Sequence, residues 1–128
     1  MLDTFVERRR AINAYYKDKL KDCPGISFLT APSEKYAANH WLTCIQIDEA
    51  TAGFNRKDLL EAMEQHDIET RPLWKPMHLQ PVFSANAYYG NGVSESLFEK
   101  GLCLPSGSSL SHDDLNEVIA VIKSMYKK

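Results

Sequence analysis

The chain has 128 residues, the length of a single domain that buries roughly two-thirds of the surface its unfolded chain would expose. Hydrophobic residues make up 44% of the chain and charged residues 25%, a composition that excludes a disordered protein and a fibre. The formal net charge of -2 gives no general attraction to phosphate backbones or anionic lipids, so we expect neither nucleic acid nor a membrane as a partner.

The first third of the chain predicts one helix followed by two strands. Apolar side chains recur at helical spacing over residues 2–20, and the Cys-Pro-Gly segment at 23–25 supplies a stop. Residues 26–29 are typical of a short strand, and residues 41–47 alternate with two fairly apolar faces, which indicates a central strand. Acidic neighbours dilute the basic cluster Arg8–Arg10, so we interpret it as a solvated face or a contact with another domain.

The rest of the chain predicts two capped helices, a shorter helix and two more strands. Asn55 is suited to cap a helix that ends near residue 66, and residues 68–73 are typical of a strand. Residues 94–100 form a short helical segment, residues 102–104 a brief strand, and Ser111 opens the final helix. This order predicts an α+β fold, with a small, mainly antiparallel sheet and helices packed on one face.

The proline-rich loop, residues 71–83, is the most unusual segment. Each of its three prolines fixes its own φ and pushes the preceding residue to extended geometry, so we expect a stiff loop without regular structure. The loop carries Arg71, Trp74, Lys75 and His78, and a rigid loop with such side chains costs little entropy to order around a polar ligand. The alternative is a structural loop whose aromatic side chains pack on the core.

The three cysteines form no CxxC pair and have no histidine at metal-ligand spacing, so we predict neither a disulfide framework nor a metal site. Cys44 and Cys103 lie in apolar strand-like runs, where we interpret them as small core residues. The N-terminus lacks the apolar run of a signal peptide, and no stretch approaches the length of a membrane span. We therefore expect a cytoplasmic protein with reduced thiols.

Three segments carry a resemblance to a known family: Asn39-His40-Trp41-Leu42, the run from Glu69 to Pro81, and the run from Gly101 to Gly107. In this order they resemble the C-terminal small domain of DegT-type pyridoxal-phosphate sugar aminotransferases, over essentially the whole chain. The nearest subgroup is that of the nucleotide-linked 4-keto-sugar aminotransferases of bacillosamine and surface-glycan synthesis. The resemblance implies the α+β fold of the C-terminal domain of fold-type I pyridoxal-phosphate enzymes.

The resemblance also implies where the chemistry lies. In this family the cofactor lysine, the acidic partner of the pyridinium nitrogen and the phosphate cradle come from a large N-terminal domain, which these 128 residues do not contain. Residues 1–128 would then be one small domain that has no catalytic residue, is inactive alone and binds no cofactor. Lys75 is a poor candidate for the cofactor lysine, because no acid-bearing strand or Gly-rich phosphate loop accompanies it.

The expected role of the loop is that of a substrate wall. Lys75 and His78 would offer donors to phosphate or sugar oxygens, with Trp74 as an apolar wall. Arg71 is suited to a bidentate contact with the carboxylate of the amino donor, or equally to an internal ion pair with a neighbouring acid. His40 is either a further substrate-side group or a polar cap at the start of a strand.

Two functions remain open at this stage. In the first, the chain belongs to an aminotransferase that moves an amino group from an amino acid to a nucleotide-linked 4-keto-deoxysugar. The complete enzyme would be a homodimer. The partners of this chain would then be the large domain and the nucleotide sugar. In the second, the chain is a free-standing module that binds a nucleotide sugar or a protein without catalysis. The sequence alone fits both.

Overall fold

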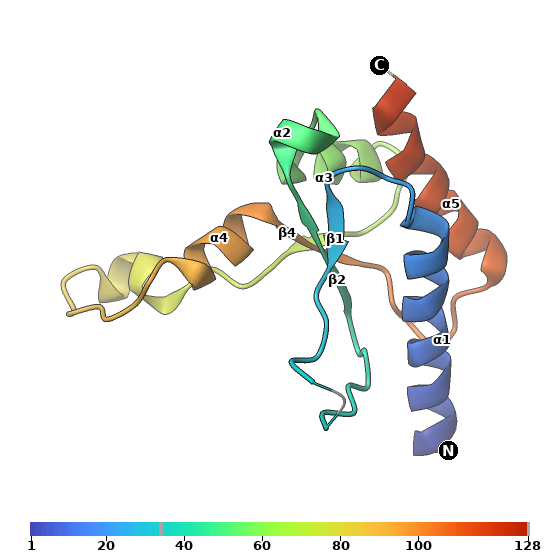
Figure 1. The fold of residues 1–128 in the computed structure, drawn as a ribbon, viewed down its shortest axis with the longest axis horizontal. Helices are drawn as coiled ribbons and strands as arrows, with labels where there is room; N and C mark the ends of the chain where they lie inside the picture. Colours follow the sequence, from blue (N-terminus) through green and yellow to red (C-terminus); the bar gives the residue numbers. More distant parts are fainter. Residues whose placement is uncertain (34, 128) are drawn as a thin grey trace.

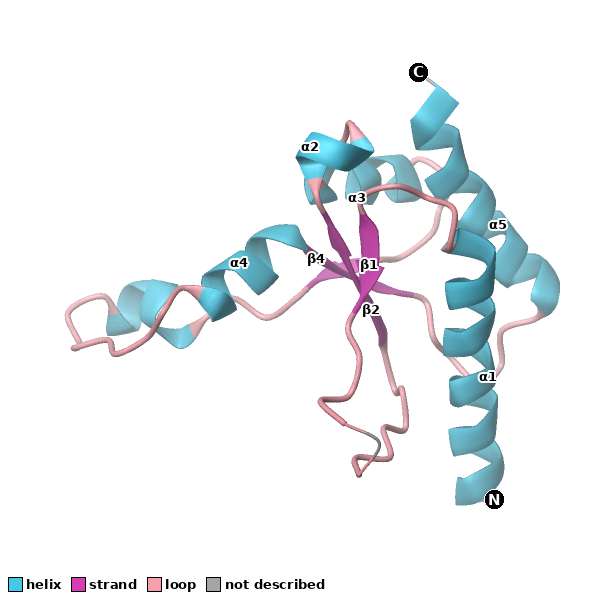
Figure 2. Cartoon of the chain, in the orientation of Figure 1, coloured by secondary structure: helices cyan, strands magenta, loops and turns pink. Residues whose placement is uncertain are grey.

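The computed structural model describes residues 1–33 and 35–127, and in them the chain forms five α-helices and a four-stranded sheet (Figures 1 and 2). In chain order the elements are α1 (Leu2–Leu20), β1 (Ile26–Phe28), β2 (Thr43–Ile47), α2 (Glu49–Ala52), α3 (Arg56–Glu64), β3 (Arg71–Pro72), α4 (Val93–Lys100), β4 (Gly101–Leu104) and α5 (His112–Ser124). None of the helices described is long and apolar enough to cross a membrane.

The sheet is antiparallel throughout, with the strand order β1-β2-β4-β3. The central position predicted for residues 41–47 is confirmed, although β2 begins only at Thr43. The strand expected over residues 68–73 is wrong in length, because β3 contains only Arg71 and Pro72. A proline has no N–H to donate to a ladder, which limits how far a strand continues through it.

The two faces of the sheet differ. On one face, Ile45, Ile47, Leu102 and Leu104 are at most 2% exposed and join the hydrophobic core with α1, α3 and α5. The second face carries Cys44, Gln46, Cys103 and Arg71, since successive side chains alternate and directly paired residues share a face. The predicted α+β fold with helices on one face is confirmed.

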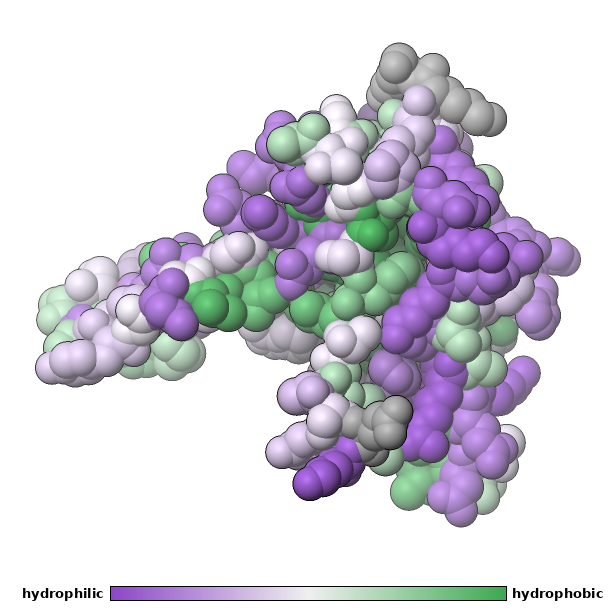
Figure 3. Space-filling view, in the orientation of Figure 1, coloured by the Kyte–Doolittle hydropathy of each residue, from purple (hydrophilic) through white to green (hydrophobic). Residues whose placement is uncertain are grey.

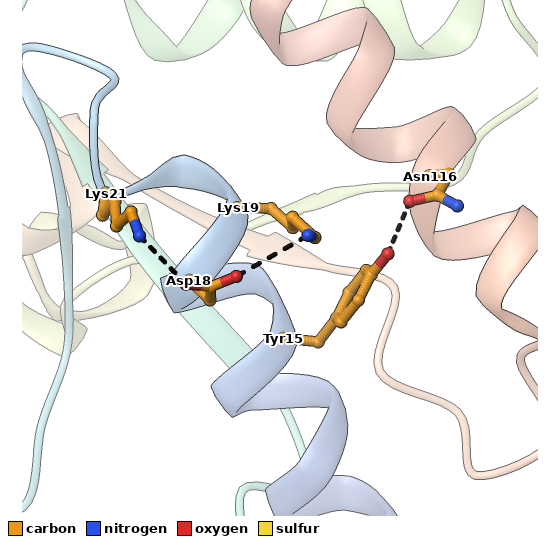
Figure 4. Close-up of polar contacts among 5 residues, drawn as sticks. All are labelled: Tyr15, Asp18, Lys19, Lys21 and Asn116. Atoms are coloured by element: carbon orange, nitrogen blue, oxygen red, sulfur yellow. Dashed lines mark hydrogen bonds and ion pairs between the residues drawn. The ribbon is translucent and has the colours of Figure 1, made fainter.

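Helices α1 and α5 pack side by side, and Figure 4 shows their polar contact. The hydroxyl of Tyr15 donates to Asn116 Oδ1 at 2.7 Å. At the end of α1, the Asp18 carboxylate lies 3.7 Å from Lys19 Nζ and 3.2 Å from Nζ of Lys21, the residue that follows the helix. These exposed ion pairs contribute little and do not reach α5. The two helices are held together by buried apolar side chains that share one core cluster, such as Leu20 of α1 and Ile122 of α5.

The caps of α3 and α5 are as the sequence predicts. Asn55 accepts hydrogen bonds from the N–H groups of Lys57 and Asp58, and the Asp58 side chain accepts from the N–H of Asn55 in return. Ser111 and Asp114 form the same reciprocal pair at α5. Each pair satisfies N–H groups that the first turn of a helix leaves without partners.

Residues 73–100, here called the arm, project from the sheet (Figure 1). No residue from Glu64 to Lys100 is buried. The absence of regular structure expected for the proline-rich loop is wrong in part, because two 3-10 turns lie there, at Met77–Leu79 and Pro81–Phe83. Proline suits the first position of a helical turn, where its missing N–H is not needed.

Candidate functional site

A pocket of about 620 Å³ lies where β2 begins, β4 ends and β3 pairs at the edge of the sheet. Its walls come from the start of β2, from the segment around β3 and from β4 with the turn that follows. The lining residues are Trp41, Leu42, Glu69, Arg71, Pro72, Trp74, Cys103, Leu104, Pro105 and Ser106. Each of the three segments that carry the sequence resemblance therefore contributes to one cavity.

Two tryptophans form the apolar rim of the pocket. The ring centroids of Trp41 and Trp74 lie 6.0 Å apart with an angle of 31° between the planes. They are the only tryptophans in the chain, and they are 58% and 66% exposed. An exposed aromatic pair beside a cavity is an unfavourable surface in water and a favourable one for a flat or partly apolar ligand.

Arg71 and Glu69 supply the charge in the pocket. Arg71 Nε donates to Glu69 Oε1 at 2.9 Å, and its Nη2 donates to the same oxygen at 2.5 Å. The internal ion pair that the sequence left as an alternative for Arg71 is therefore present. Both side chains are more than 70% exposed, so the pair is weak and an incoming anion can compete for the guanidinium.

A buried hydrogen-bond network fixes the turn that closes the pocket. Ser106 Oγ accepts from the N–H of Thr43 at 2.8 Å and donates to the carbonyl of Leu104 at 2.8 Å. Asn13 Nδ2 donates to Thr43 Oγ1 at 3.3 Å, which links the turn to α1. The Tyr16 hydroxyl donates to the carbonyl of Pro105 at 2.9 Å, and burial raises the pKa of Tyr16.

The basic cluster of α1 holds the segment before β2. Arg9 donates to the carbonyl of Trp41, and Arg10 Nε donates to the carbonyl of Ala38 at 2.9 Å. Interpreting the cluster only as a solvated face or an interdomain contact was therefore incomplete, because both guanidiniums bind the backbone of this chain. They place Trp41 at the rim of the pocket.

Of the residues predicted to contact a ligand, Arg71 and Trp74 line the pocket, whereas Lys75, His78 and His40 do not. Lys75 is exposed at the base of the arm. His78 Nε2 lies 2.6 Å from Glu95 Oε1, and its ring stacks on Tyr88 with centroids 3.5 Å apart. His40 is half-buried with a left-handed φ of 48°, and burial first, then Lys17 and Arg10, lower its pKa.

Sequence reasoning missed Leu42 and gave Cys103 only a core role. The cross-strand register places Cys103 directly opposite both Cys44 and Arg71, and nothing in the sequence reveals that register. Pro105 and Ser106, which belong to the third segment that carries the resemblance, also line this wall. Among residues 1–33 and 35–127, no cluster of three His, Cys, Asp or Glu side chains is arranged to hold a metal ion.

Comparison with known proteins gives one consistent result. The model of the DegT/DnrJ/EryC1/StrS aminotransferase family matches residues 1–123. The protein EpsN from Bacillus subtilis (strain 168) is 38% identical over 133 residues, which cover 98% of this chain and 32% of that protein. GDP-perosamine synthase of Vibrio cholerae is 28% identical, over 98% of this chain and 34% of the enzyme.

The fold comparison agrees. DesI, whose structure was solved in the presence of its TDP-sugar product, aligns with a TM-score of 0.83 and 25% identity, over 96% of this chain and 32% of that chain. The chain thus spans about a third of the length of the relatives that it matches.

Proposed function

Because the chain belongs to the DegT/DnrJ/EryC1/StrS aminotransferase family, we propose that it is the C-terminal small domain of a pyridoxal-phosphate-dependent sugar aminotransferase and that its pocket forms one wall of the substrate site. The complete enzyme would transfer an amino group from an amino acid to a nucleotide-linked 4-keto-deoxysugar. It would act in the cytoplasm as a homodimer, with the large domain as the partner of this chain.

The convergence of three separate segments on one pocket is the observation that supports this proposal. The pocket offers an aromatic pair for a sugar ring or base and one guanidinium for an anion. One relative is named for a GDP-linked sugar, and the related DesI structure was solved with a TDP-linked sugar. The flat, partly apolar faces of a nucleotide sugar suit the aromatic pair, and the carboxylate of an amino donor suits the guanidinium.

The residues that line the pocket do not fit the cofactor itself. Pyridoxal phosphate needs a lysine, an acidic partner for its ring nitrogen and donors around its phosphate. Within the part of the chain that the structure describes, no lysine lines the pocket, and its one carboxylate, Glu69, is already paired with Arg71. We therefore assign to this domain the binding and orientation of the substrate, with the cofactor held by the large domain.

The proposed roles follow the positions of the side chains. Arg71 would leave Glu69 to bind the carboxylate of the amino donor, while Trp74 would pack against the sugar nucleotide. Lys75 and His78 lie farther along the arm, so they would contact only a ligand that extends out of the pocket past Trp74. His40 would act at the opposite rim, through its neighbour Trp41.

A reconstitution experiment tests the proposal. This chain is mixed with a separately produced large domain from a family member, and amino transfer to a nucleotide-linked 4-keto sugar is measured. We expect activity only with both parts, and a drop of roughly tenfold to a hundredfold in kcat/KM for the amino donor with Arg71→Gln. The matched control is Arg56→Gln, since Arg56 is an arginine outside the pocket.

Binding to the chain alone distinguishes the alternative of a free-standing module. Because both tryptophans lie at the pocket, their fluorescence reports its occupancy. Tight binding of GDP- or TDP-sugars to the isolated chain, without activity after mixing, would favour a binding module. Activity after mixing that is unaffected by Arg71→Gln and Trp74→Ala would place the substrate elsewhere.

A further inference from the structure

Cys44 and Cys103 face each other across the two inner strands of the sheet. They are direct cross-strand partners, and their sulfur atoms lie 3.7 Å apart. Directly opposed residues of antiparallel strands have Cα atoms about 4.5–5.5 Å apart, within the range of about 4.4–6.8 Å found in disulfides. A disulfide bond of about 2.05 Å therefore requires only small side-chain rotations.

We propose that Cys44 and Cys103 are a reversible redox pair, which closes to a disulfide between β2 and β4 when the protein meets a hydroperoxide. The bond would cross-link the strands at the wall of the pocket, because Cys103 lines the cavity and is paired with Arg71 on its other side. This site does not depend on the proposed aminotransferase function, since it follows from strand register and sulfur geometry alone.

The two thiols are unequal, which assigns their roles. Cys44 is half-buried, whereas Cys103 is 5% exposed, so an oxidant in solution reaches Cys44 first. The contact between the thiols lowers the pKa of Cys44 and raises the pKa of Cys103, and burial raises that of Cys103 further. The thiolate is the reactive form, so Cys44 is the attacking residue and Cys103 the resolving one.

The chemistry balances with hydrogen peroxide as the oxidant. The Cys44 thiolate attacks one peroxide oxygen, the O–O bond breaks, and after protonation Cys44 is a sulfenic acid and one water has left. The Cys103 sulfur then attacks the Cys44 sulfur, the S–O bond breaks, and a second water leaves with the thiol proton. Two electrons pass from the sulfurs to the peroxide. A dithiol reductant then reduces the disulfide by thiol–disulfide exchange and is itself oxidised to a disulfide.

Cys23 provides a matched internal control. It is buried in the turn after α1, is 9% exposed, and has a pKa that burial raises. Among the described residues, Cys44 and Cys103 are the cysteines with a sulfur partner. The structure therefore predicts that two of the three thiols react together and that the third stays reduced.

The test is a count of alkylatable thiols, with intact mass, after treatment with about one equivalent of hydrogen peroxide. The wild-type chain has three thiols and should keep one after oxidation, whereas Cys23→Ala has two thiols and should keep none. In both proteins the mass should fall by two hydrogens, and the oligomeric state should not change. A dithiol reductant should restore the thiols. Cys44→Ala and Cys103→Ala should form no intramolecular bond.

A second measurement keeps the proposal testable if one variant folds poorly. Oxidation of the wild type and of Cys23→Ala should change the fluorescence of Trp41 and Trp74 reversibly, because the new bond forms in the wall of their pocket. Disulfide-linked dimers, irreversible oxygen adducts without loss of two thiols, or an intramolecular bond that disappears in Cys23→Ala would each overturn the proposal.

Discussion

The core and the arm use the same kinds of apolar residues with opposite outcomes. In the core, Leu102 is 0% exposed beneath the helices, whereas in the arm Leu79 is 41%, Val82 75% and Tyr89 94% exposed. The arm is held by local contacts such as His78 with Glu95 and Tyr88. Stability of the fold therefore comes from burial in the core, while the arm leaves apolar side chains exposed on the surface.

Figure 3 shows hydrophobic residues along the base of the arm and across the middle of the sheet, beside the hydrophilic outer side of α1.

A pair of leucine substitutions gives the sharpest test of this difference. Leu102→Ala leaves a cavity among fully buried neighbours and should lower the free energy of unfolding by about 2–5 kcal/mol. Leu79→Ala removes the same atoms from an exposed position and should cost less than about 1 kcal/mol. Urea denaturation of both variants measures the effect. Equal losses would mean that the arm belongs to the same cooperative unit as the core.

The next largest effect is expected in the turn that closes the pocket. Ser106→Ala leaves the buried N–H of Thr43 and the carbonyl of Leu104 without their partner, which should cost about 1–3 kcal/mol. Ser84→Ala in the arm removes an exposed hydrogen bond to the carbonyl of Pro81 and should change stability by less than about 0.5 kcal/mol. If Ser106→Ala is as mild as Ser84→Ala, the network does not fix the pocket.

Local sequence signals predicted the core far better than they predicted the arm. Helical periodicity indicated α1, and the reciprocal caps of Asn55 and Ser111 indicated the starts of α3 and α5, because these signals act within a few residues. The one-turn helix α2 was not predicted, and the two 3-10 turns of the arm lie where the prolines indicated an extended loop.

The site was predicted only in part, because it depends on contacts between distant segments. The loop composition identified Arg71 and Trp74, which line the pocket. It could not reveal that His78 would pair with Glu95, 17 positions along the chain, or that Cys103 would face Cys44. Such pairs follow from the path of the arm and from strand register, which no local pattern encodes.

The His78–Glu95 contact tests whether the arm is an independent unit. His78→Ala removes the hydrogen bond to Glu95 and the stacking on Tyr88, at a local cost of about 1 kcal/mol, so amides of residues 77–100 should exchange roughly fivefold faster. Core amides should be unchanged, because no residue of the arm is buried in the core. His66→Ala, at an exposed helix end, is the control. Faster exchange throughout the core would show that the two regions unfold together.

The smallest expected effect concerns the N-terminal caps of two helices, α5 beside the core and α4 in the arm. In the core, the backbone N–H of Ser111 first, and then its hydroxyl, lower the pKa of Asp114 below its ordinary value near 3.8. In the arm, α4 begins at Val93, and the preceding Gly92 provides no side-chain cap. Because the pKa is depressed in the folded state, the Asp114 cap stabilises α5 above pH 3.8, and this contribution is lost as the pH falls through the lower folded pKa.

Nuclear magnetic resonance titration of the Asp114 carboxyl measures this effect directly. The wild type should titrate below 3.8, and Ser111→Ala should move the pKa only part of the way back, since the backbone N–H, which is the larger cause, remains. Asp114→Asn should remove the titration and weaken the protection of the first turn of α5 at neutral pH, where the carboxylate otherwise accepts both hydrogen bonds. An Asp114 that titrates at its ordinary value would mean that the start of α5 frays in solution and is no better fixed than that of α4.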